Sequence, residues 1–409
     1  FNAHGEPVRV TYCTKTFYER DCYRITFDDG THIIADGVHR WAVNDMWAND
    51  PYELKVFDTN RLRESYRVET SSGRHRYRYS IPVAGPLQLP EAELPIDPYV
   101  LGLWLGDGSH CNGYLALGNQ DADELIMHIE MDTDFVVAGV YPGNSQGTAS
   151  VVNLHRADGV PLITLLKEFG LYQNKHIPAI YLRASEVQRR ELLRGLMDTD
   201  GCVSSTGRIQ LSQSRKELFD QAVELVRSLG FKPMIDVCTP SYTYKGERRT
   251  GQPSYRLSFT VENSTNVFKL SRHCDRYSNA SRQQPRRPTH SLRRFIRNIE
   301  PVESVPVRCI SVDDASHLFL IGEQMVPTHN TDAMLINTIL YSVLVDPMDT
   351  MIVCPSQHEA RDFSMRRVDR LHLHSKQVGE MLLGSRVADN TLDKQYLNGM
   401  LLSLSWPTP

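Results

Sequence analysis

Two Asp-Gly pairs, each closing an apolar run, are the residues of this sequence best suited to act as a chemical pair. Asp107 ends the run LGLWLGDG at 101–108, and Asp200 ends LLRGLMDTDG at 192–201, 93 residues later. Two neighbouring carboxylates repel each other unless a cation lies between them, and oxygen ligands favour Mg²⁺. A single Asp-Gly pair usually marks only a turn at a helix end. The prediction of a shared metal site therefore depends on the repetition.

The sequence that follows each aspartate also repeats. Residues 113–125 (GYLALGNQDADEL) parallel residues 207–218 (GRIQLSQSRKEL), with Leu117 matching Leu211 at an offset of 94. Two copies of helix, turn, strand and helix predict an α+β domain with pseudo-twofold symmetry. Small residues four apart allow two helix backbones to approach closely. Each helix carries such a pair: Gly102 and Gly106 on the first, Gly195 and Thr199 on the second.

Basic residues are concentrated in one region, although the whole chain has a net charge of −4. Residues 245–297 contain 13 Lys and Arg against three acidic residues. This excess is able to neutralise phosphates and would make binding salt-dependent. A solvated charged stretch explains the same composition equally well.

Together with Lys175-His-Ile-Pro178 between them, the two acidic motifs resemble the LAGLIDADG (DOD-type) homing endonucleases found inside inteins. The resemblance implies that Asp107 and Asp200 bind catalytic Mg²⁺, and that Lys175 lies near the scissile phosphate or the attacking water. It also implies a monomer whose β-sheets follow the major groove of a long, asymmetric double-stranded DNA site. A nuclease-dead, sequence-specific DNA-binding insert remains the alternative. Candidate DNA contacts on or beside the predicted strands are Arg208, Lys216, Lys232, Arg248, Arg249 and Arg256.

A second chemistry is available in the tetrapeptide Thr328-His-Asn-Thr331. The side-chain amide of Asn330 can attack its own main-chain carbonyl and cut the chain, while His329 polarises that carbonyl. The hydroxyl of Thr331 can accept an acyl group. Taken alone, this tetrapeptide is an ordinary loop.

Elements on either side of the acidic repeat resemble the Hint (hedgehog/intein) domain. Asp36-x-x-His39-x-Trp41 is similar to its N-terminal element, and Cys309-Ile-Ser-Val with His317-Leu-Phe319 to its C-terminal element. Trp41, Cys309 and Thr328 together resemble the signature of class 3 inteins. A buried strand thiol is the alternative interpretation of Cys309.

The class 3 resemblance implies a splicing mechanism that needs no N-terminal nucleophile. Cys309, as thiolate, attacks the N-terminal junction with help from His39, and the acyl chain then passes to Thr331. Asn330 cyclises while His329 and His317 handle protons. Splicing itself needs no cofactor.

The sequence from Thr331 onward has an α/β pattern: a helix through Leu344, then a buried strand at 350–354. Three stretches resemble a phage terminase large subunit, an ATP-driven DNA-packaging motor: DAMLINTILYSVLVDP, MIVCPSQHEARDFS and YLNGMLLSLSWPT. In the rejoined host protein Thr331 would close a phosphate-binding loop, so ATP and Mg²⁺ concern only that protein. Another P-loop ATPase is the alternative.

Composition bounds the remaining possibilities for this chain of 409 residues. No apolar stretch approaches the roughly 20 residues of a membrane span. The eight cysteines form no C-x-x-C pair, which disfavours a zinc ribbon and predicts thiols of a bacterial cytoplasm. Because the sequence starts at Phe1 without Met, we expect the first strands of the Hint domain to lie upstream.

The predicted architecture is therefore multidomain. It comprises an all-β Hint splicing domain in two parts (1–90 and 299–330), a pseudo-twofold α+β endonuclease (95–275), a basic linker (276–298) and an α/β P-loop ATPase fragment (331–409).

Overall fold

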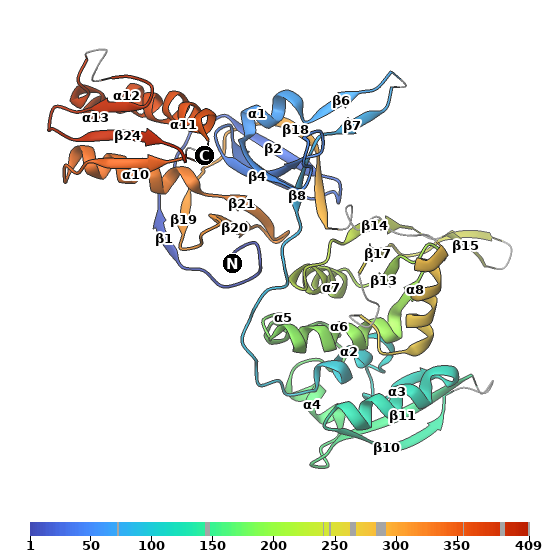
Figure 1. Cartoon of the computed structure of the whole chain (residues 1–409). Helices are drawn as coiled ribbons and strands as arrows, with labels where there is room; N and C mark the ends of the chain where they lie inside the picture. The colour runs from blue at the N-terminus through green and yellow to red at the C-terminus, as the bar shows by residue number, and fades with distance from the viewer. Residues whose placement is uncertain are drawn as a thin grey trace. The chain divides into compact units, whose positions relative to one another are not determined.

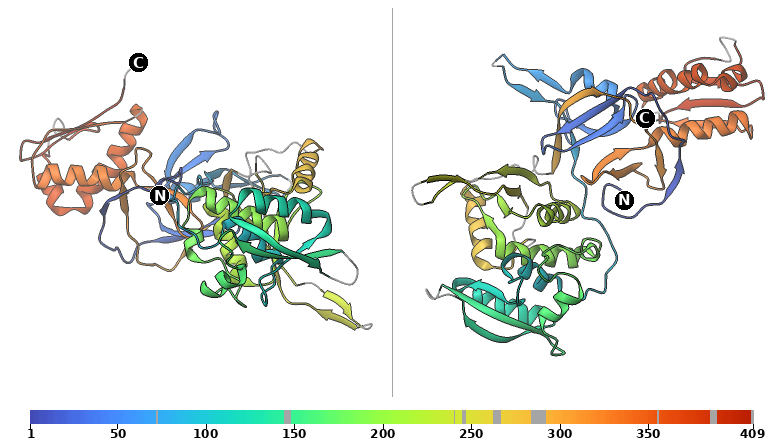
Figure 2. Two further views of the ribbon diagram at one scale, coloured as in Figure 1. Left: turned by 90° about the horizontal axis from the view of Figure 1, so that it is seen from below. Right: turned by 180° about the vertical axis from the view of Figure 1, so that it is seen from behind.

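The computed structural model describes residues 1–71, 73–143, 148–239, 241–244, 247–261, 267–283, 292–354, 356–384 and 389–407. The chain divides into two compact units (Figure 1). The first comprises residues 1–8, 19–305 and 318–329, and the second comprises residues 9–18, 306–317 and 330–409. Within the first unit, residues 83–97 run as an extended segment from a β-rich part to a part with paired helices (Figures 1 and 2).

One sheet organises the β-rich part and joins segments from both ends of the sequence. Its strand order is β20-β21-β4-β8-β18-β2-β3, with β5 paired to β4. The buried core under it includes Ile25, Trp41, Val43, Ile81 and Ile296. The strands are β2 (Cys22–Phe27), β3 (His32–Asp36), β4 (Arg40–Asp45), β5 (Leu54–Asp58), β8 (Tyr79–Pro82), β18 (Arg293–Val302), β20 (Leu318–Ile321) and β21 (Val326–His329).

A hairpin with its turn at Asp28-Asp29-Gly30 joins the first two strands of this sheet. β2 and β3 pair antiparallel from Cys22↔Asp36 to Thr26↔His32. The turn is fixed by a buried ion pair in which Arg294 Nε lies 2.8 Å from Asp29 Oδ2. This contact holds the pKa of Asp29 below its ordinary value, despite the opposing effect of burial.

The helical part contains the predicted repeat. The first copy is α2 (Pro98–Asp107), β9 (Leu115–Gly118) and α3 (Asn119–Asp132); the second is α6 (Glu186–Asp200), β12 (Gly201–Val203), β13 (Ile209–Gln213) and α7 (Lys216–Ser228). Each copy adds strands to its own sheet: β10 (Phe135–Pro142) and β11 (Ala149–Arg156) in the first, β14 (Met234–Cys238) and β17 (Ser254–Phe259) in the second. Between the copies lie α4 (Leu162–Glu168) and α5 (Ala179–Leu182).

Capping residues fix where the two central helices begin. Asp97 accepts hydrogen bonds from the amides of Tyr99 (2.8 Å) and Val100 (3.2 Å) at the start of α2. Ser185 and Gln188 form a capping box at the start of α6. Because both helices have defined starts and end at an Asp-Gly pair, their lengths follow from local sequence.

Glycines allow the two helices to pack with their backbones in contact, as predicted. A Cβ added to Gly102 would collide with Leu192 O and lie 2.7 Å from Leu196 N. One added to Gly195 would collide with Tyr99 O. Farther along, Gly106 faces Thr199 in the same way. The predicted close packing is confirmed.

Two domain boundaries lie at other residues than the sequence predicts. α8 (Ser271–Gln283) continues past residue 275, where the endonuclease was predicted to end, and β18 begins at Arg293 rather than at 299. The region 276–298 was predicted as a linker because its composition is basic and contains proline. Its two ends are instead regular structure, because α8 buries Tyr277 and Ala280 and β18 buries Phe295 and Ile296.

The second unit contains a small α/β layer. β22 (Thr350–Val353) runs parallel to β24 (Leu401–Ser405), and β23 (Asp393–Gln395) pairs antiparallel with β24. The predicted helix through Leu344 is α10 (Thr331–Leu344), followed by α11 (Gln357–Phe363), the π-helical turn η2 (Ser364–Val368), α12 (Asp369–His374) and α13 (Lys376–Met381). β1 (Val10–Cys13) pairs with β19 (Ile310–Val312) in this unit, although we had predicted both segments to belong with the Hint sheet.

We expect Gly195→Ala to destabilise the paired-helix part by about 1–3 kcal/mol or more, because its Cβ meets rigid backbone atoms. Gly118→Ala is the control, since a Cβ there has nothing within 4 Å; it should cost only the weaker N-cap of α3, about 0.5–1 kcal/mol. Urea unfolding of both variants measures the difference. Equal effects of the two substitutions would contradict the close packing.

Candidate functional site

The two aspartates predicted to act together lie at the C-terminal ends of the packed helices. Asp107 ends α2 and Asp200 ends α6, and both are half-buried. The position of a Cβ on Gly106, next to Asp107, is only 3.4 Å from Asp200 Cγ. Burial raises the pKa of both carboxyls, and the negative charge of Asp107 helps to raise the pKa of Asp200 to about 6. The two carboxyls are therefore close enough to repel each other.

Lys175 lies at the same helix ends. Its Nζ donates hydrogen bonds to Leu105 O (3.1 Å) and Gly106 O (2.9 Å), the uncapped carbonyls of the last turn of α2. Burial lowers its pKa to about 8, while the charges of Asp200 and Asp107 oppose that shift. The structure therefore places the predicted lysine beside the predicted carboxylates.

Sequence reasoning missed Gln213, which holds one of the carboxylates. Its Nε2 donates a hydrogen bond of 2.5 Å to Asp200 Oδ2. Gln213 ends β13, and at the repeat offset of 94 its counterpart is Asn119, directly after β9. An amide at the same place in both copies was the signal that could have identified it.

The surroundings of the acid pair break the pseudo-twofold symmetry. Asp121 follows β9, is buried, and pairs with Arg272 Nε at 2.5 Å; its charge contributes to the raised pKa of Asp107. Its counterpart at offset 94 is Arg215, whose positive charge contributes to the lowered pKa of Lys175. The two halves thus present opposite charges to one shared centre.

The donor set at the helix ends fits a hydrated divalent cation. Mg²⁺ commonly binds through one or two carboxylates and keeps several waters. A cation beside Asp107 and Asp200 would also relieve the repulsion that raises the pKa of Asp200. Among the described residues, no group of three or more His, Cys, Asp or Glu side chains is arranged to hold a metal. The pair therefore suits a site completed by water and substrate oxygens.

The second sheet presents a polar face suited to contact a polyanion. On its buried face Leu211 pairs with Leu257, whereas on the opposite face Ser212 pairs with the exposed Arg256. The exposed Arg208 lies directly before β13. Arg256 and Arg208 thus remain available as predicted DNA contacts.

The other predicted DNA contacts differ in where their side chains lie and in the groups they contact. Arg248 is exposed on β16 (Glu247–Thr250), which pairs with β15 (Ser241–Tyr244), and it donates to Ser241 Oγ at 3.1 Å. Lys216 is exposed at the start of α7 rather than on a strand and pairs with Asp220. The side chain of Arg249 lies outside the described residues.

The prediction that Lys232 contacts DNA is wrong. Its side chain is buried, and its Nζ donates to Asp28 Oδ2 at 2.8 Å and to Arg293 O at 2.7 Å. An ammonium paired in the interior is not available to a phosphate. Lys232 instead ties the chain after α7 to the β2–β3 turn and to β18.

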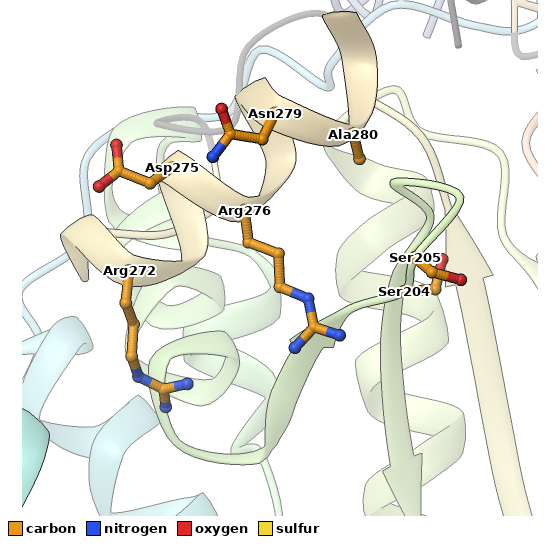
Figure 3. A pocket seen from close by; sticks show the side chains of 7 residues that line it. All are labelled: Ser204, Ser205, Arg272, Asp275, Arg276, Asn279 and Ala280. Carbon is orange, nitrogen blue, oxygen red and sulfur yellow. The ribbon is translucent and has the colours of Figure 1, made fainter. Parts of the chain in front are cut away.

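A hollow of about 620 Å³ lies between α8 and the turn after β12, beside the second sheet (Figure 3). The side chain of Arg276 reaches from α8 toward this turn, and Arg272 lies on the same helix (Figure 3). Its lining residues are Ser204, Ser205, Arg272, Asp275, Arg276, Asn279 and Ala280. The hollow adds the basic side chains of Arg272 and Arg276 beside the second sheet.

In the β-rich part, three predicted splicing residues lie together around one imidazole. His39 Nε2 is hydrogen-bonded to Thr328 Oγ1, and its ring packs edge-on against Trp41 with centroids 4.8 Å apart. Trp41 is buried and donates from Nε1 to Thr59 Oγ1 at 2.9 Å. Burial lowers the pKa of His39 to about 4, so its imidazole is neutral at pH 7. A neutral imidazole can accept a proton. Asp36 lies just upstream, where its carbonyl accepts from the amide of His39 at 3.2 Å.

The second unit holds the side chain of Asn330 in one orientation. With its amide oriented to satisfy both neighbours, it accepts from Val312 N at 2.7 Å and donates to His317 O at 3.1 Å. The main-chain amide of Asn330 also donates to His317 O, at 3.0 Å. His317 has φ of +57°, a left-handed conformation that is uncommon for non-glycine residues. Strain of this kind is often retained at functional sites.

The remaining splicing residues are placed as follows. Cys309 is half-buried in the second unit, where its amide donates to Thr14 Oγ1 at 3.0 Å. His329 is buried at the end of β21 and pairs with Arg40 of β4. Thr331 opens α10, and its side chain lies outside the described residues.

Two family models match parts of this chain. Residues 187–271 match the LAGLIDADG-like domain. Residues 294–409 match the ATPase domain of the phage terminase large subunit gpA. The chain thus combines a LAGLIDADG-like domain with a terminase-like ATPase segment.

Two curated relatives are replicative DNA helicases. The chain is 34% identical to the replicative DNA helicase DnaB of Mycobacterium intracellulare in an alignment of 345 positions that covers 80% of this chain and 54% of that protein. It is 47% identical over 60 residues to the replicative DNA helicase DnaB of Mycobacterium leprae (strain TN), or 15% of this chain and 9% of that protein. The chain therefore spans about half the length of the first relative.

Similar solved structures include those of the homing endonuclease I-DmoI. A structure of its mesophilic variants has a TM-score of 0.28 at 13% identity, covering 42% of this chain and 94% of that one. A complex of I-DmoI with DNA and Mn has a TM-score of 0.27 at 14% identity, covering 41% and 89%. In the part of the chain that the structure describes, no helix has the length and apolar character needed to cross a membrane.

Charge changes around the acid pair should move the pKa of Asp200 in opposite directions. Asp107→Asn removes a negative charge and should lower that pKa from about 6, whereas Lys175→Met removes a positive charge and should raise it. Carboxyl NMR titration of metal-free protein measures both shifts. Shifts of the same sign, or none, would mean that the three groups do not form one electrostatic site.

Proposed function

We propose that residues 95–283 are a metal-dependent endonuclease that cleaves double-stranded DNA. The observation that carries the proposal is the contact between two glycine-faced helices, whose ends bring together Asp107, Asp200 and Lys175. The LAGLIDADG-like match over residues 187–271 covers the second of these helices. The polar face of the second sheet, with Arg208 and Arg256, supplies the side for DNA.

The residues at the helix ends have separate roles in the proposed hydrolysis. Asp107 and Asp200 would hold Mg²⁺, which when bound would stabilise negative charge on the scissile phosphate and promote ionisation of the attacking water. Gln213 donates to one oxygen of Asp200 and so fixes the orientation of that carboxylate. Lys175, held by two carbonyls of α2, keeps a positive charge beside the substrate phosphate below its pKa of about 8.

We further propose that residues 1–330 are an intein, an insert that excises itself and joins its flanks. Residues 1–330 are 330 of 409 residues, or about 81% of the chain. The helicase relative aligns over 80% of the chain, whereas residues 294–409 match a terminase domain. The similarity thus extends to a helicase over most of the chain and to a terminase at its C-terminal end. Two such different host proteins support an insert that is able to occupy more than one host.

The splicing residues support two of the proposed steps. In the proposal His39 accepts a proton in the first step, when Cys309 attacks the upstream junction; its neutral imidazole, in contact with Thr328 and Trp41, supports this role. In the proposal the side-chain amide of Asn330, whose orientation is held by Val312 N and His317 O, attacks its own main-chain carbonyl. That attack forms the succinimide C–N bond and breaks the peptide bond to Thr331, whose amine leaves with the proton. His329 and His317 donate and accept that proton. Before this cleavage the Thr331 hydroxyl takes the acyl chain from Cys309, breaking the thioester and releasing the thiol. The freed Thr331 amine then attacks the resulting ester, which exchanges the ester bond for a peptide bond.

The proposed host is a terminase large subunit, since residues 294–409 match its ATPase domain. In the rejoined protein Thr331, the first residue of α10, would complete a phosphate-binding loop at a helix N-terminus. ATP hydrolysis and DNA packaging would belong to that protein.

Incubating the chain with DNA that spans an uninterrupted host gene tests the endonuclease. We expect Mg²⁺-dependent double-strand breaks, lost by at least about 10³-fold in Asp107→Asn or Asp200→Asn. Asp346→Asn, an exposed carboxylate of the second unit just after α10, is the matched control and should cut normally. DNA that is bound but never cut by the native chain would leave the nuclease-dead alternative.

Release of a C-terminal fragment that begins at Thr331 tests the splice junction. The native chain should release it with a succinimide at the new end of residues 1–330, and Asn330→Ala should abolish release. Asn398→Ala, which removes a hydrogen bond to Val343 O, is the control and should not change it. Mass spectrometry identifies both products. Cleavage that persists in Asn330→Ala would overturn the proposed junction.

A further inference from the structure

A short arginine-rich hairpin in the β-rich part is not explained by either proposed chemistry. β6 (Arg67–Glu69) and β7 (His75–Tyr77) pair antiparallel, with Val68 opposite Arg76 and Glu69 opposite His75. The pair extends away from the main sheet as a two-stranded ribbon (Figure 1). We call this ribbon, together with Arg74, the arginine hairpin.

The charge of this segment is strongly one-sided. Residues 61–78 contain six Arg and two Glu. Arg61 stacks on Phe57, Arg63 stacks on Tyr23, and Arg78 pairs with Asp45 at 2.7 Å. The other three, Arg67, Arg74 and Arg76, are exposed, and Arg67 also lies 5.3 Å over the ring of its neighbour Tyr66. Within the described part of the chain, none of these three forms an ion pair with a carboxylate.

The arginine hairpin contributes little to the core. Both of its strands are exposed, and Val68 keeps 47% of its surface accessible. A two-stranded ribbon alone is only marginally stable, and its like charges repel one another. The arginine hairpin contacts the main sheet through Tyr77, whose ring lies 4.0 Å from the guanidinium of Arg297 on β18. Arg297 is exposed and adds one more positive charge beside β7. A polyanion bound to the ribbon would remove this repulsion.

We propose that the arginine hairpin binds the phosphate backbone of duplex DNA, as a contact separate from the sheets of the LAGLIDADG-like part. Guanidinium groups bind phosphate with two parallel hydrogen bonds, and a two-stranded ribbon has the size to enter a major groove. The β-rich splicing fold then enlarges the DNA footprint of the endonuclease and strengthens binding without reading sequence. This inference rests on the proposed function only for the choice of DNA as ligand.

Salt-dependent binding of the full chain to a long duplex of random sequence, without divalent metal, tests the proposal. Each lost phosphate contact lowers the slope of log K against log salt by about 0.9. The triple variant Arg67→Gln, Arg74→Gln, Arg76→Gln should therefore lose up to about 2.7 in slope. Its affinity at low salt should fall by at least about tenfold. Glu69→Gln should shift affinity the other way, which excludes simple unfolding of the ribbon as the cause.

A matched triple variant separates a local contact from net charge. Arg361→Gln, Arg370→Gln, Lys376→Gln makes the same change in charge at exposed positions of the second unit, and should leave the slope unchanged. Equal losses from both triples, or no loss from the hairpin triple, would overturn the proposal. It would equally be overturned if the hairpin triple lost binding to anionic phospholipid vesicles but kept binding to DNA.

The outcome is distinguishable from failure of the proposed nuclease. Asp107→Asn should abolish cleavage and leave the hairpin-dependent slope intact. If the native chain never cuts DNA but the hairpin triple variant has a smaller salt slope, the nuclease proposal fails and the hairpin proposal stands. If the native chain cuts DNA normally and the triple variant has an unchanged slope, the hairpin proposal fails and the nuclease proposal stands.

Discussion

The close approach of α2 and α6 is the constraint on which the proposed nuclease site depends. Gly102 and Gly195 leave no room for a Cβ between the two backbones, so the helices are fixed relative to each other. Their ends then place Asp107 beside Asp200 at a cost, because burial and mutual repulsion raise the pKa of Asp200 to about 6. A cation is the natural partner for carboxylates held in this way.

Buried cations connect the LAGLIDADG-like part to the segments around it. Lys232 pairs with Asp28 in the β2–β3 turn, and Arg189 of α6, fully buried, donates from Nη1 to Ser228 O at 2.6 Å and from Nη2 to Leu87 O. Leu87 belongs to the extended segment that leads into α2. A buried charge that loses its partners is strongly destabilising. Loss of these partners should therefore destabilise the packing around α6 and the β2–β3 turn.

The proposed splicing residues use a different physical device, which is fixed orientation rather than charge. His39 is kept neutral by burial and is held by Thr328 and Trp41. Asn330 is held by main-chain groups of Val312 and His317, the latter in a left-handed conformation. His39 and Thr328 are 289 residues apart in the sequence, and His317 and Asn330 lie on either side of the β20–β21 pair. Both arrangements therefore form only once the strands have paired.

The sequence by itself determined the repeat, the lengths of α2 and α6, and α10, because caps, glycines and apolar spacing act over a few residues. It also identified Asp107, Asp200 and Lys175 as one group. Only the tertiary structure decided that Lys232 is buried, that Gln213 binds Asp200, and that residues 9–18 and 306–317 belong with the second unit. Those outcomes depend on which distant backbone groups meet a side chain, and no local spacing in the sequence encodes them.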